Sequence, residues 1–397
     1  MKILMITPYL PYPPFSGGQV RSYHLIKNLA HKHQIFLISL VKNNQEKKYI
    51  KELEKFCARV WAFDRPSSPW TLRNIIRTGF SFDPFLVVRN FSALAKKKIK
   101  EEIAKENFDL IHAETFYVMS HIPPTKIPIL LVEQTIECQV YDHFVKTLPY
   151  YLFFLKPFLY FDIFKLEWWE KFYWRKADLV AAVSESDQKM IIQLVKKVNV
   201  RVVPNGVDCN YFSKKVTAKE AVPTVVFVGN FKWLQNKEAV DLLVKKIWPL
   251  IVKKNQQVRL LIVGRHSEEF VRVCDPRIRV KKVRDIREAY QTGWVFIAPF
   301  RSGGGSRLKI FEAMASGLPV VATAKGVEGI RVKNGVHYLK GETSQELATN
   351  VIRLINNREL ALKIAFAARR LTSLNYDWQI SAKKLDNVYR EITNGKN

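Results

Sequence analysis

The chain has 397 residues, 48% of them hydrophobic and 25% charged, a composition that excludes disordered, collagen-like and small disulfide-rich proteins. This length predicts two or three domains. Lys and Arg outnumber Asp and Glu by 64 to 36, and the net charge of +28 favours partners such as nucleotides, anionic membranes or nucleic acid.

The first half of the chain alternates short apolar strands with amphipathic helices. Strands are predicted at 2–7, 34–41, 59–63, 109–113, 128–133, 178–183 and 200–203, and helices at 20–31, 43–57, 92–106, 165–177 and 185–197. Strands that alternate with helices indicate a parallel sheet with crossover helices.

The second half repeats this alternation after a polar stretch at 213–222, which is predicted to be a linker. Strands are predicted at 224–229, 259–264, 278–283, 294–299 and 319–323, helices at 236–254, 285–292 and 306–316, and a helical tail at 343–393. We therefore predict an α/β fold of two doubly wound, Rossmann-like domains facing a central cleft. The expected domains are 1–205 and 206–375, with a C-terminal helix at 376–397 that packs back on the first.

A glycine-rich loop carries the sharpest chemical signal. The strand that ends at Pro299 is followed by Gly303, Gly304 and Gly305 and by a helix predicted to begin near Ser306. Glycine amides and a helix N-terminus together bind anions. Arg307 and Lys309 in the first turn oppose the helix dipole, a cost that a bound phosphate would offset. The alternative is a flexible loop with two solvated cations.

Other candidates for the same site come from the second domain. Glu312 lies within the following helix, where it would accept hydrogen bonds from a ribose or remain a surface glutamate. Gly229 and Asn230 follow the strand at 224–229 and permit close approach of a ligand. Lys237 would meet a diphosphate or remain solvated.

The first domain offers a second group of candidates at its carboxyl strand edge. Gly17 and Gly18 form a turn into a helix, and Arg21 lies one turn further on. His112 and Gln134 follow two neighbouring strands. The alternatives are a tight turn without a ligand and a histidine that packs in the core.

The aromatic segment 149–174 exceeds what one helix face needs for packing. It is predicted either to lie on a membrane or to form an aromatic core between domains. In the membrane interpretation, lipid headgroups meet Lys156, Lys165, Lys171, Arg175 and Lys176. The apolar run 150–164 is too short and too charged to cross a bilayer. The four cysteines, none in a CxxC pair, are typical of a reducing cytosol and argue against zinc.

Together these motifs resemble the family 4 glycosyltransferases of the GT-B fold. The resemblance rests on PYPPFSGGQVRSYHLIKNLA at the start, ADLVAAVSESD at 177–187, VVPNGVDCNYF at 202–212, FVGNFKWLQNKEAV at 227–240 and GGGSRLKIFEAMASGLPVVAT at 303–323. It implies a nucleotide-sugar donor on the second domain, an acceptor on the first, transfer with retention at the anomeric carbon, and no essential metal or other cofactor.

Carried over by position, the resemblance gives several residues a role. Glu312 matches the glutamate that binds the donor ribose, and residues 303–306 match the loop that faces the donor sugar and phosphates. Gly17 and Gly18 match the first-domain glycine loop. Arg307 and Lys309 match the basic pair of a subgroup with a GGGSRLK loop.

Three positions depart from the family pattern. Gly304 replaces a second glutamate, which implies different sugar recognition. Asn230 replaces an arginine, so Lys237 with Arg307 and Lys309 becomes the expected phosphate clamp. Gln134 replaces a histidine, so histidine chemistry at the acceptor is not expected.

The expected function is a retaining glycosyltransferase that moves a sugar to a glycan or lipid-linked acceptor in cell-surface polysaccharide biosynthesis. It would act in the cytoplasm, at the inner face of an anionic membrane, without a nucleic-acid partner. The alternatives are a nucleotide-sugar epimerase on the same fold and a polyanion- or membrane-binding protein.

Overall fold

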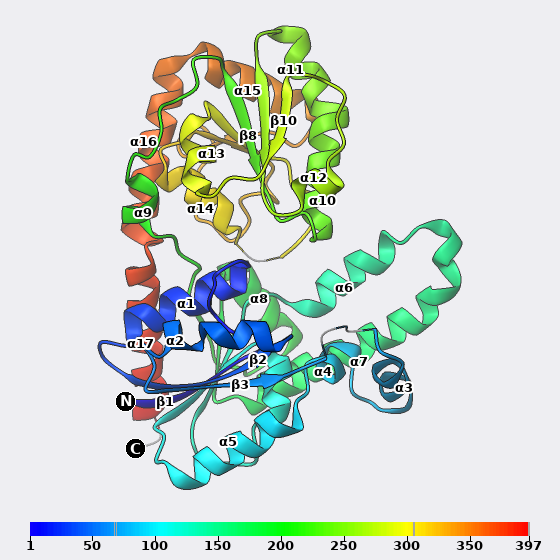
Figure 1. The fold of residues 1–397 in the computed structure, drawn as a ribbon, viewed down its shortest axis with the longest axis vertical. Coiled ribbons are helices and arrows are strands. Elements are labelled where there is room, and N and C mark those ends of the chain that lie inside the picture. Colours follow the sequence, from blue (N-terminus) through cyan, green and yellow to red (C-terminus); the bar gives the residue numbers. More distant parts are fainter. Residues whose placement is uncertain (67, 69, 305, 396–397) are drawn as a thin grey trace. The chain divides into compact units, whose positions relative to one another are not determined.

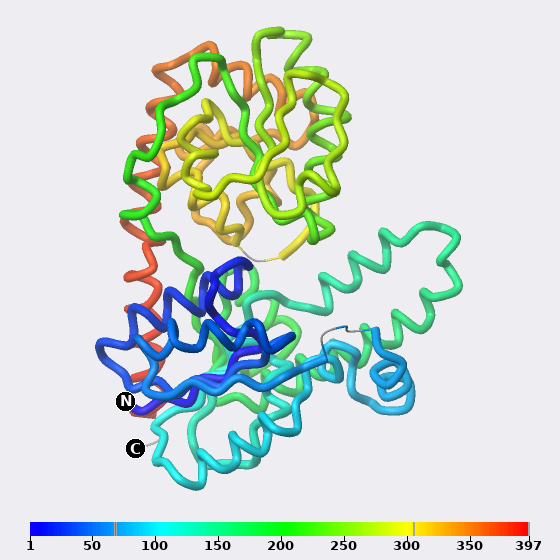
Figure 2. Tube along the Cα trace, viewed as in Figure 1, coloured from blue at the N-terminus to red at the C-terminus, as the bar shows by residue number. Residues whose placement is uncertain are grey.

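The computed structural model describes residues 1–66, 68, 70–304 and 306–395, which form two parallel-sheet α/β domains (Figure 1). The N-terminal domain comprises Met1–Pro204 together with Ser381–Asn397, and the C-terminal domain comprises Asn205–Ile380. The second division therefore falls at 380/381, a few residues later than the predicted 375/376. Thr393 of the last helix contacts Met1, so the start of the chain and the end of α17 lie together in the N-terminal domain (Figure 2).

The N-terminal domain contains a parallel sheet of seven strands in the order β3-β2-β1-β4-β5-β6-β7. Its strands are β1 (Lys2–Thr7), β2 (Gln34–Val41), β3 (Arg59–Asp64), β4 (Leu110–Glu114), β5 (Ile129–Glu133), β6 (Leu179–Ala182) and β7 (Val200–Val202). Apolar runs such as ILLV in β5 are buried because helices cover both faces of a parallel sheet. The strand order reverses at β1 and β4, and ligands of doubly wound sheets bind outside the carboxyl ends of such a pair.

The helices of this domain include five that the sequence pattern did not predict. They are α1 (Gly17–Leu29), η1 (Asn44–Tyr49), α2 (Ile50–Leu53), α3 (Leu72–Phe80), α4 (Phe85–Arg89), α5 (Ala93–Lys105), η2 (Phe116–His121), α6 (Glu137–Lys146), η3 (Tyr150–Leu155), α7 (Lys156–Lys176), α8 (Glu185–Leu194) and the part of α17 (Trp378–Asn394) beyond Ile380. The prediction missed α3, α4, α6 and the short helices η2 and η3, and it began α7 nine residues too late. The aromatic side chains of α7 obscure its helical period, because its exposed and buried positions are both apolar.

The C-terminal domain contains a parallel sheet of six strands in the order β10-β9-β8-β11-β12-β13. Its strands are β8 (Thr224–Val228), β9 (Arg259–Val263), β10 (Ile278–Lys281), β11 (Val295–Ala298), β12 (Val320–Ala322) and β13 (Leu339–Lys340). The order reverses at β8 and β11, which places the expected ligand crevice outside their carboxyl ends.

The helices of the C-terminal domain correct two predicted boundaries. They are α9 (Cys209–Ser213), α10 (Leu234–Leu242), η4 (Leu243–Ile247), α11 (Trp248–Lys254), α12 (Ser267–Phe270), α13 (Ile286–Thr292), α14 (Leu308–Ala315), α15 (Ser344–Asn356) and α16 (Arg358–Asn375). The helix predicted at 236–254 is interrupted by the π turn η4, because Pro249 has no N–H to donate in the next turn. Helix α14 begins at Leu308 rather than near Ser306. Residues 214–223 carry no helix or strand.

Candidate active site

Two glycines allow the carboxyl ends of β8 and β9 to approach each other closely. Gly264 follows β9 with φ +146°, and a Cβ on it would lie 1.7 Å from the carbonyl oxygen of Gly229. A Cβ on Gly229 would in turn meet the Asn236 side chain at 3.3 Å. The Gly229 and Gly264 backbones and the Asn236 side chain therefore lie together at the carboxyl end of β8, next to the point where the strand order reverses between β8 and β11.

Asn236 connects this turn to Lys309 on α14. The buried Asn236 side chain donates to the Asn230 carbonyl oxygen at 2.7 Å, and its Oδ1 accepts from Lys309 Nζ at 2.5 Å. Lys309 Nζ also lies 4.8 Å from the centre of the Phe300 ring. Burial and the like charge of Arg307 lower the pKa of Lys309 to about 7, against the attraction of Glu312. An anion at this position would restore the lysine's preference for its charged form.

Arg307 connects the start of the glycine-rich loop to the segment that follows β12. Its guanidinium donates to the carbonyl oxygens of Lys325 at 2.6 Å and Ser302 at 2.5 Å, and it lies 4.7 Å from the Phe300 ring centre. Burial lowers its pKa to about 10, so it remains charged at neutral pH. Arg307 is the N-cap residue of α14, and its own side chain makes no capping hydrogen bond to the helix amides. The start of α14 is thus available to an anionic ligand.

Glu312 lies on α14, half-buried, where the Tyr290 hydroxyl donates to its Oε2 at 2.7 Å. Burial raises the pKa of Glu312, and the Tyr290 hydrogen bond and the Lys309 charge oppose that shift. Oε2 is therefore engaged by Tyr290, a residue that sequence reasoning missed because it lies 22 positions away.

The other predicted donor-side residues do not all lie beside Lys309 and Arg307. Lys237 Nζ lies over the Phe270 ring, 3.6 Å from its centre, rather than with Lys309 and Asn236. The buried Ser306 side chain accepts a hydrogen bond from Asn205 Nδ2 at 3.2 Å, which connects residues 204–206 to the glycine-rich loop. Gly303 has φ +97°, a conformation that favours glycine. Gly304 is exposed, and Gly305 lies outside the described residues.

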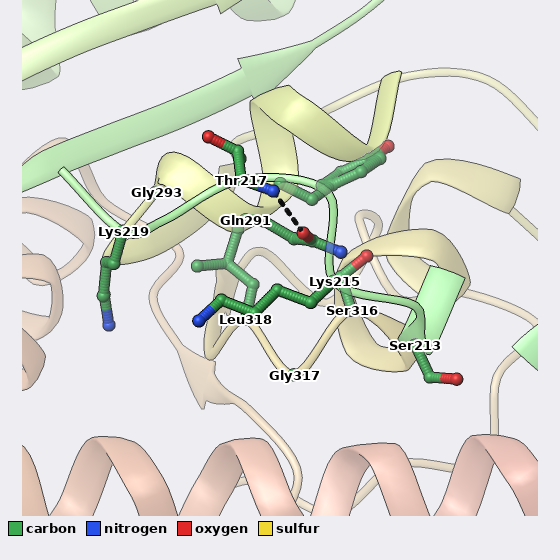
Figure 3. A pocket seen from close by; sticks show the side chains of 10 residues that line it. Ser213, Lys215, Thr217, Lys219, Gln291, Gly293, Ser316, Gly317 and Leu318 are labelled. Atoms are coloured by element: carbon green, nitrogen blue, oxygen red, sulfur yellow. Dashed lines mark hydrogen bonds between the residues drawn. The ribbon is translucent and has the colours of Figure 1, made fainter. Parts of the chain in front are cut away.

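A separate shallow pocket of about 300 Å³ lies in the same domain (Figure 3). Gly293 and Leu318, which line it, precede β11 and β12, whereas the glycine-rich loop follows β11. Its other wall is the 213–219 segment, where Gln291 accepts from the Thr217 amide (Figure 3). The pocket is therefore at the amino edge of the sheet, opposite the candidate donor site.

On the acceptor side, the Gly18 turn is packed against two polar side chains. A Cβ on Gly18 would lie 2.2 Å from the Tyr9 hydroxyl and 2.5 Å from Gln134 Oε1. Gln134 Nε2 donates to the Tyr9 hydroxyl at 2.7 Å and to Glu114 Oε2. Gly17, the first residue of α1, is exposed. The structure thus brings Gly18 and Gln134 together, with Tyr9 between β1 and α1.

His112 and Arg21 lie deeper in the same network. His112 is fully buried, with Nε2 3.1 Å from Glu114 Oε1 and Nδ1 2.5 Å from the Tyr389 hydroxyl of α17. Arg21 is 1% exposed and interacts with Glu114, although burial lowers its pKa. Burial works to raise the pKa of Glu114, but His112 and Arg21 hold it below its usual value. His112 and Arg21 therefore support Glu114 from within the core.

Several residues of these networks carried little signal in the sequence. Asn236 and Tyr290 sit in unremarkable helical stretches, and Tyr389 lies near the end of the chain, 277 positions from His112. Tyr9 is different, because it lies just beyond the carboxyl end of β1, where ligands of doubly wound sheets bind.

Replacing Tyr389 by phenylalanine should lower the free energy of unfolding by about 1–2 kcal/mol, because a buried His112 nitrogen loses its partner. Urea denaturation followed by circular dichroism measures this loss. Tyr151→Phe, at a side chain that is 71% exposed, is the matched control and should leave stability unchanged. Equal stability of the two variants would contradict a structural role for the Tyr389 hydroxyl.

Comparison with known proteins places this architecture in one class. Residues 15–211 match the family described as Glycosyltransferase Family 4, and residues 222–357 match the family described as Glycosyl transferases group 1. The Alr3699/HepE protein of Anabaena, solved in complex with UDP, superposes with a TM-score of 0.69 at 17% identity, covering 98% of this chain and 100% of that one.

Two relatives known from their sequences extend the comparison. An uncharacterized 44.6 kDa protein from the cps region of Klebsiella pneumoniae is 21% identical over 98% of this chain and 99% of its own length. The sulfoquinovosyl transferase SQD2 of Arabidopsis thaliana is 25% identical over 73% of this chain and 58% of its own length.

The two sheets and the comparisons define a glycosyltransferase of the GT-B type. The chain belongs to glycosyltransferase family 4, with a group 1 domain in its second half.

Proposed function

We propose that this chain is a retaining, metal-independent glycosyltransferase that moves a sugar from a nucleotide-diphosphate sugar to a glycan or lipid-linked acceptor. The observation that carries the proposal is the pairing of Lys309 and Arg307 beside the uncapped start of α14, at the switch point of the second sheet. The Arg307 guanidinium, the Lys309 ammonium that a bound phosphate favours, and a helix N-terminus supply the charge that a diphosphate leaving group requires.

In this proposal the donor lies along the loop 303–306. The loop amides and Ser306 face its phosphates, Glu312 accepts hydrogen bonds from its ribose, and Gly229 with Asn230 gives it room at the end of β8. Lys237 belongs to an outer part of this site, since its ammonium is held against Phe270. No cofactor takes part, and the nucleotide-sugar is a substrate.

The difficult step is departure of the nucleoside diphosphate from the anomeric carbon. The C–O bond to the phosphate breaks with its electron pair on the phosphate oxygen, and Lys309 and Arg307 stabilise the growing negative charge. An acceptor hydroxyl attacks from the face that the phosphate leaves, and the departing phosphate oxygen takes its proton. A glycoside with retained configuration and a free nucleoside diphosphate result.

The acceptor side rests on Tyr9, Gln134 and Glu114 around Gly18. Similarity to a Klebsiella protein of the cps region supports a role in cell-surface polysaccharide biosynthesis. A lipid-linked acceptor fits a chain with +28 net charge working in peripheral contact with an anionic membrane, at its cytoplasmic face.

Thermal shift with UDP, GDP, ADP and their sugars in the presence of EDTA tests the proposal. One nucleotide family at about 100 times its dissociation constant should stabilise the chain by about 2.7 kcal/mol, a rise of about 5–10 °C in Tm. Glu312→Ala should reduce that rise. A rise that depends on divalent metal would remove metal independence, and no rise on folded protein would remove the donor site.

A further inference from the structure

Large apolar side chains are exposed over two neighbouring elements of the N-terminal domain, α3 and the η3–α7 segment. Phe80 is 92% exposed, Tyr150 is 87% and Phe158 is 77%. The exposed set, called here the aromatic face, consists of Trp70, Leu72, Ile75, Ile76, Phe80, Phe82, Tyr150, Tyr151, Phe153, Phe154, Leu155, Phe158, Tyr160, Phe161, Phe164, Trp168 and Phe172. An apolar patch of this extent marks an interaction surface.

Buried polar contacts fix α3 and α7 to each other. The Lys165 side chain, with 1% of the residue exposed, donates to the carbonyl oxygen of Thr78 in the last turn of α3 at 2.8 Å and to that of Asp83 just beyond α3 at 3.3 Å. Trp169 Nε1 donates to the Phe82 carbonyl oxygen at 2.9 Å. Lys165 is therefore internal, which contradicts the expectation that it meets lipid headgroups.

A further carboxylate completes the connection. Asp162 lies 3.4 Å from Lys165 and accepts from the Phe85 amide at 3.0 Å, at the start of α4. Helices α6 and α7 pack together and extend from the sheet of this domain (Figure 1). The aromatic face is thus presented by a built scaffold rather than by a loose loop.

Both segments carry a net positive charge. Helix α3 has Arg73 and Arg77 and no Asp or Glu, and residues 150–176 have five Lys or Arg against Asp162, Glu167 and Glu170. Arg77 lies 3.7 Å from Asp83, and Lys146 of the preceding α6 is paired with Asp142. Arg73 and Lys146 are exposed. Cations beside Phe, Tyr and Trp suit the headgroup level of an anionic bilayer, where aromatic rings are enriched.

A second copy of this chain fits the aromatic face less well than a bilayer does, because two faces with a net positive charge would come together. None of the helices in residues 1–66, 68, 70–304 and 306–395 is long and apolar enough to cross a membrane. The occupant that best fits the aromatic face is therefore the surface of an anionic bilayer.

We propose that α3 and the η3–α7 segment form a monotopic docking surface for an anionic lipid bilayer, with the aromatic face inserted at the level of the headgroups and first acyl carbons. This inference rests on the proposed function in that it identifies the elements that bring the first domain to a lipid-linked acceptor. Lys165 acts as an internal brace that keeps the two elements in register on the membrane.

Flotation of the full chain with vesicles tests the docking surface, without nucleotide. Vesicles of phosphatidylglycerol and phosphatidylethanolamine should retain the protein much better than phosphatidylcholine vesicles. The double variant Phe80→Ser/Phe158→Ser should weaken binding to the anionic vesicles at least about tenfold, since both rings lose apolar burial. Phe366→Ser on α16 of the other domain, at a ring that is 70% exposed, is the matched control and should bind normally.

Charge and depth give two further measurements. Arg73→Gln and Lys156→Gln should each weaken anionic binding by about fivefold and leave binding to phosphatidylcholine unchanged. Brominated lipid should quench tryptophan emission, and less so in Trp70→Phe/Trp168→Phe. Wild-type protein that stays off every vesicle, or that forms a dimer which the Phe80→Ser/Phe158→Ser variant dissolves, would overturn the proposal in favour of a protein partner.

The proposed function fails separately. Hydrolysis of the nucleotide-sugar, measured without vesicles, should be unaffected by Phe80→Ser/Phe158→Ser, whereas transfer to a membrane-embedded acceptor should fall with vesicle binding. Vesicle binding without any nucleotide-sugar turnover would leave the docking surface standing and remove the transferase mechanism.

Discussion

Replacing Lys309 by methionine should lower kcat for sugar transfer by about 100- to 1000-fold. The lysine is held by Asn236 at the switch point of the second sheet, where negative charge grows on the leaving diphosphate. Removal of one preorganised group that stabilises such charge costs about this much. Steady-state kinetics with radiolabelled nucleotide-sugar measures it, and methionine keeps the length and packing of the lysine stem.

Lys246→Met is the matched control, because Lys246 is exposed on η4 of the same domain. It should retain wild-type kcat and Tm. A Lys309→Met variant that folds normally and transfers sugar at the wild-type rate would eliminate Lys309 from the phosphate clamp and leave Arg307 as its remaining cation.

The same lysine gives the reaction a pH signature. Its pKa is lowered to about 7, so the free enzyme holds the ammonium below pH 7 and loses it above. The value of kcat/KM should therefore fall as pH rises through about 7, and it should not do so in Lys309→Met. Because the unfolded chain keeps this proton to higher pH, stability due to Lys309 should rise with pH above 7.

Replacing Gly264 by alanine should lower the free energy of unfolding by about 3–5 kcal/mol. Its φ of +146° is strained for any residue with a Cβ, and the new carbon would lie 1.7 Å from the Gly229 carbonyl oxygen. The carboxyl ends of β8 and β9 must then separate, and this movement also displaces Asn236. The urea midpoint of the C-terminal domain and the Tm rise with donor measure the two effects.

Gly335→Ala separates backbone strain from collision. Gly335 also has a positive φ, +76°, but a Cβ on it would meet nothing within 4 Å. It should cost only about 1–2 kcal/mol. If the two variants lose equal stability, the close approach of β8 and β9 is not the feature that Gly264 protects.

Much of this architecture follows from local patterns. Buried apolar runs such as KILMIT and TVVFVG predicted strands, and the alternation predicted both parallel sheets. The glycine-rich loop after β11 predicted an anion site, which stays a prediction, and in the structure Arg307 donates to the Ser302 carbonyl beside that loop while Lys309 donates to Asn236. These features depend on short stretches of chain, so the sequence carries them locally.

The remainder depends on contacts across long separations. Tyr290 reaches Glu312, and Tyr389 reaches His112, through folding rather than through spacing. Lys165 looked like a surface cation among aromatic residues, yet it caps α3. Helix α3 was missed although Leu72, Ile75, Ile76 and Phe80 recur at helical spacing, and these apolar side chains are exposed rather than packed in the core.

The last helix has a consequence for how the protein is made. Residues 381–397 complete the N-terminal domain, and they supply Tyr389 to His112, Asp386 to His33 and Glu391 to Arg201. A ribosome delivers these residues only after the entire C-terminal domain has emerged. Of the two domains, the one synthesised first is therefore finished last, and until α17 emerges its β4 histidine, His112, and its buried His33 lack their contacts with Tyr389 and Asp386. Ribosome stalling or truncation before residue 381 should yield a folded C-terminal domain attached to an incomplete N-terminal one.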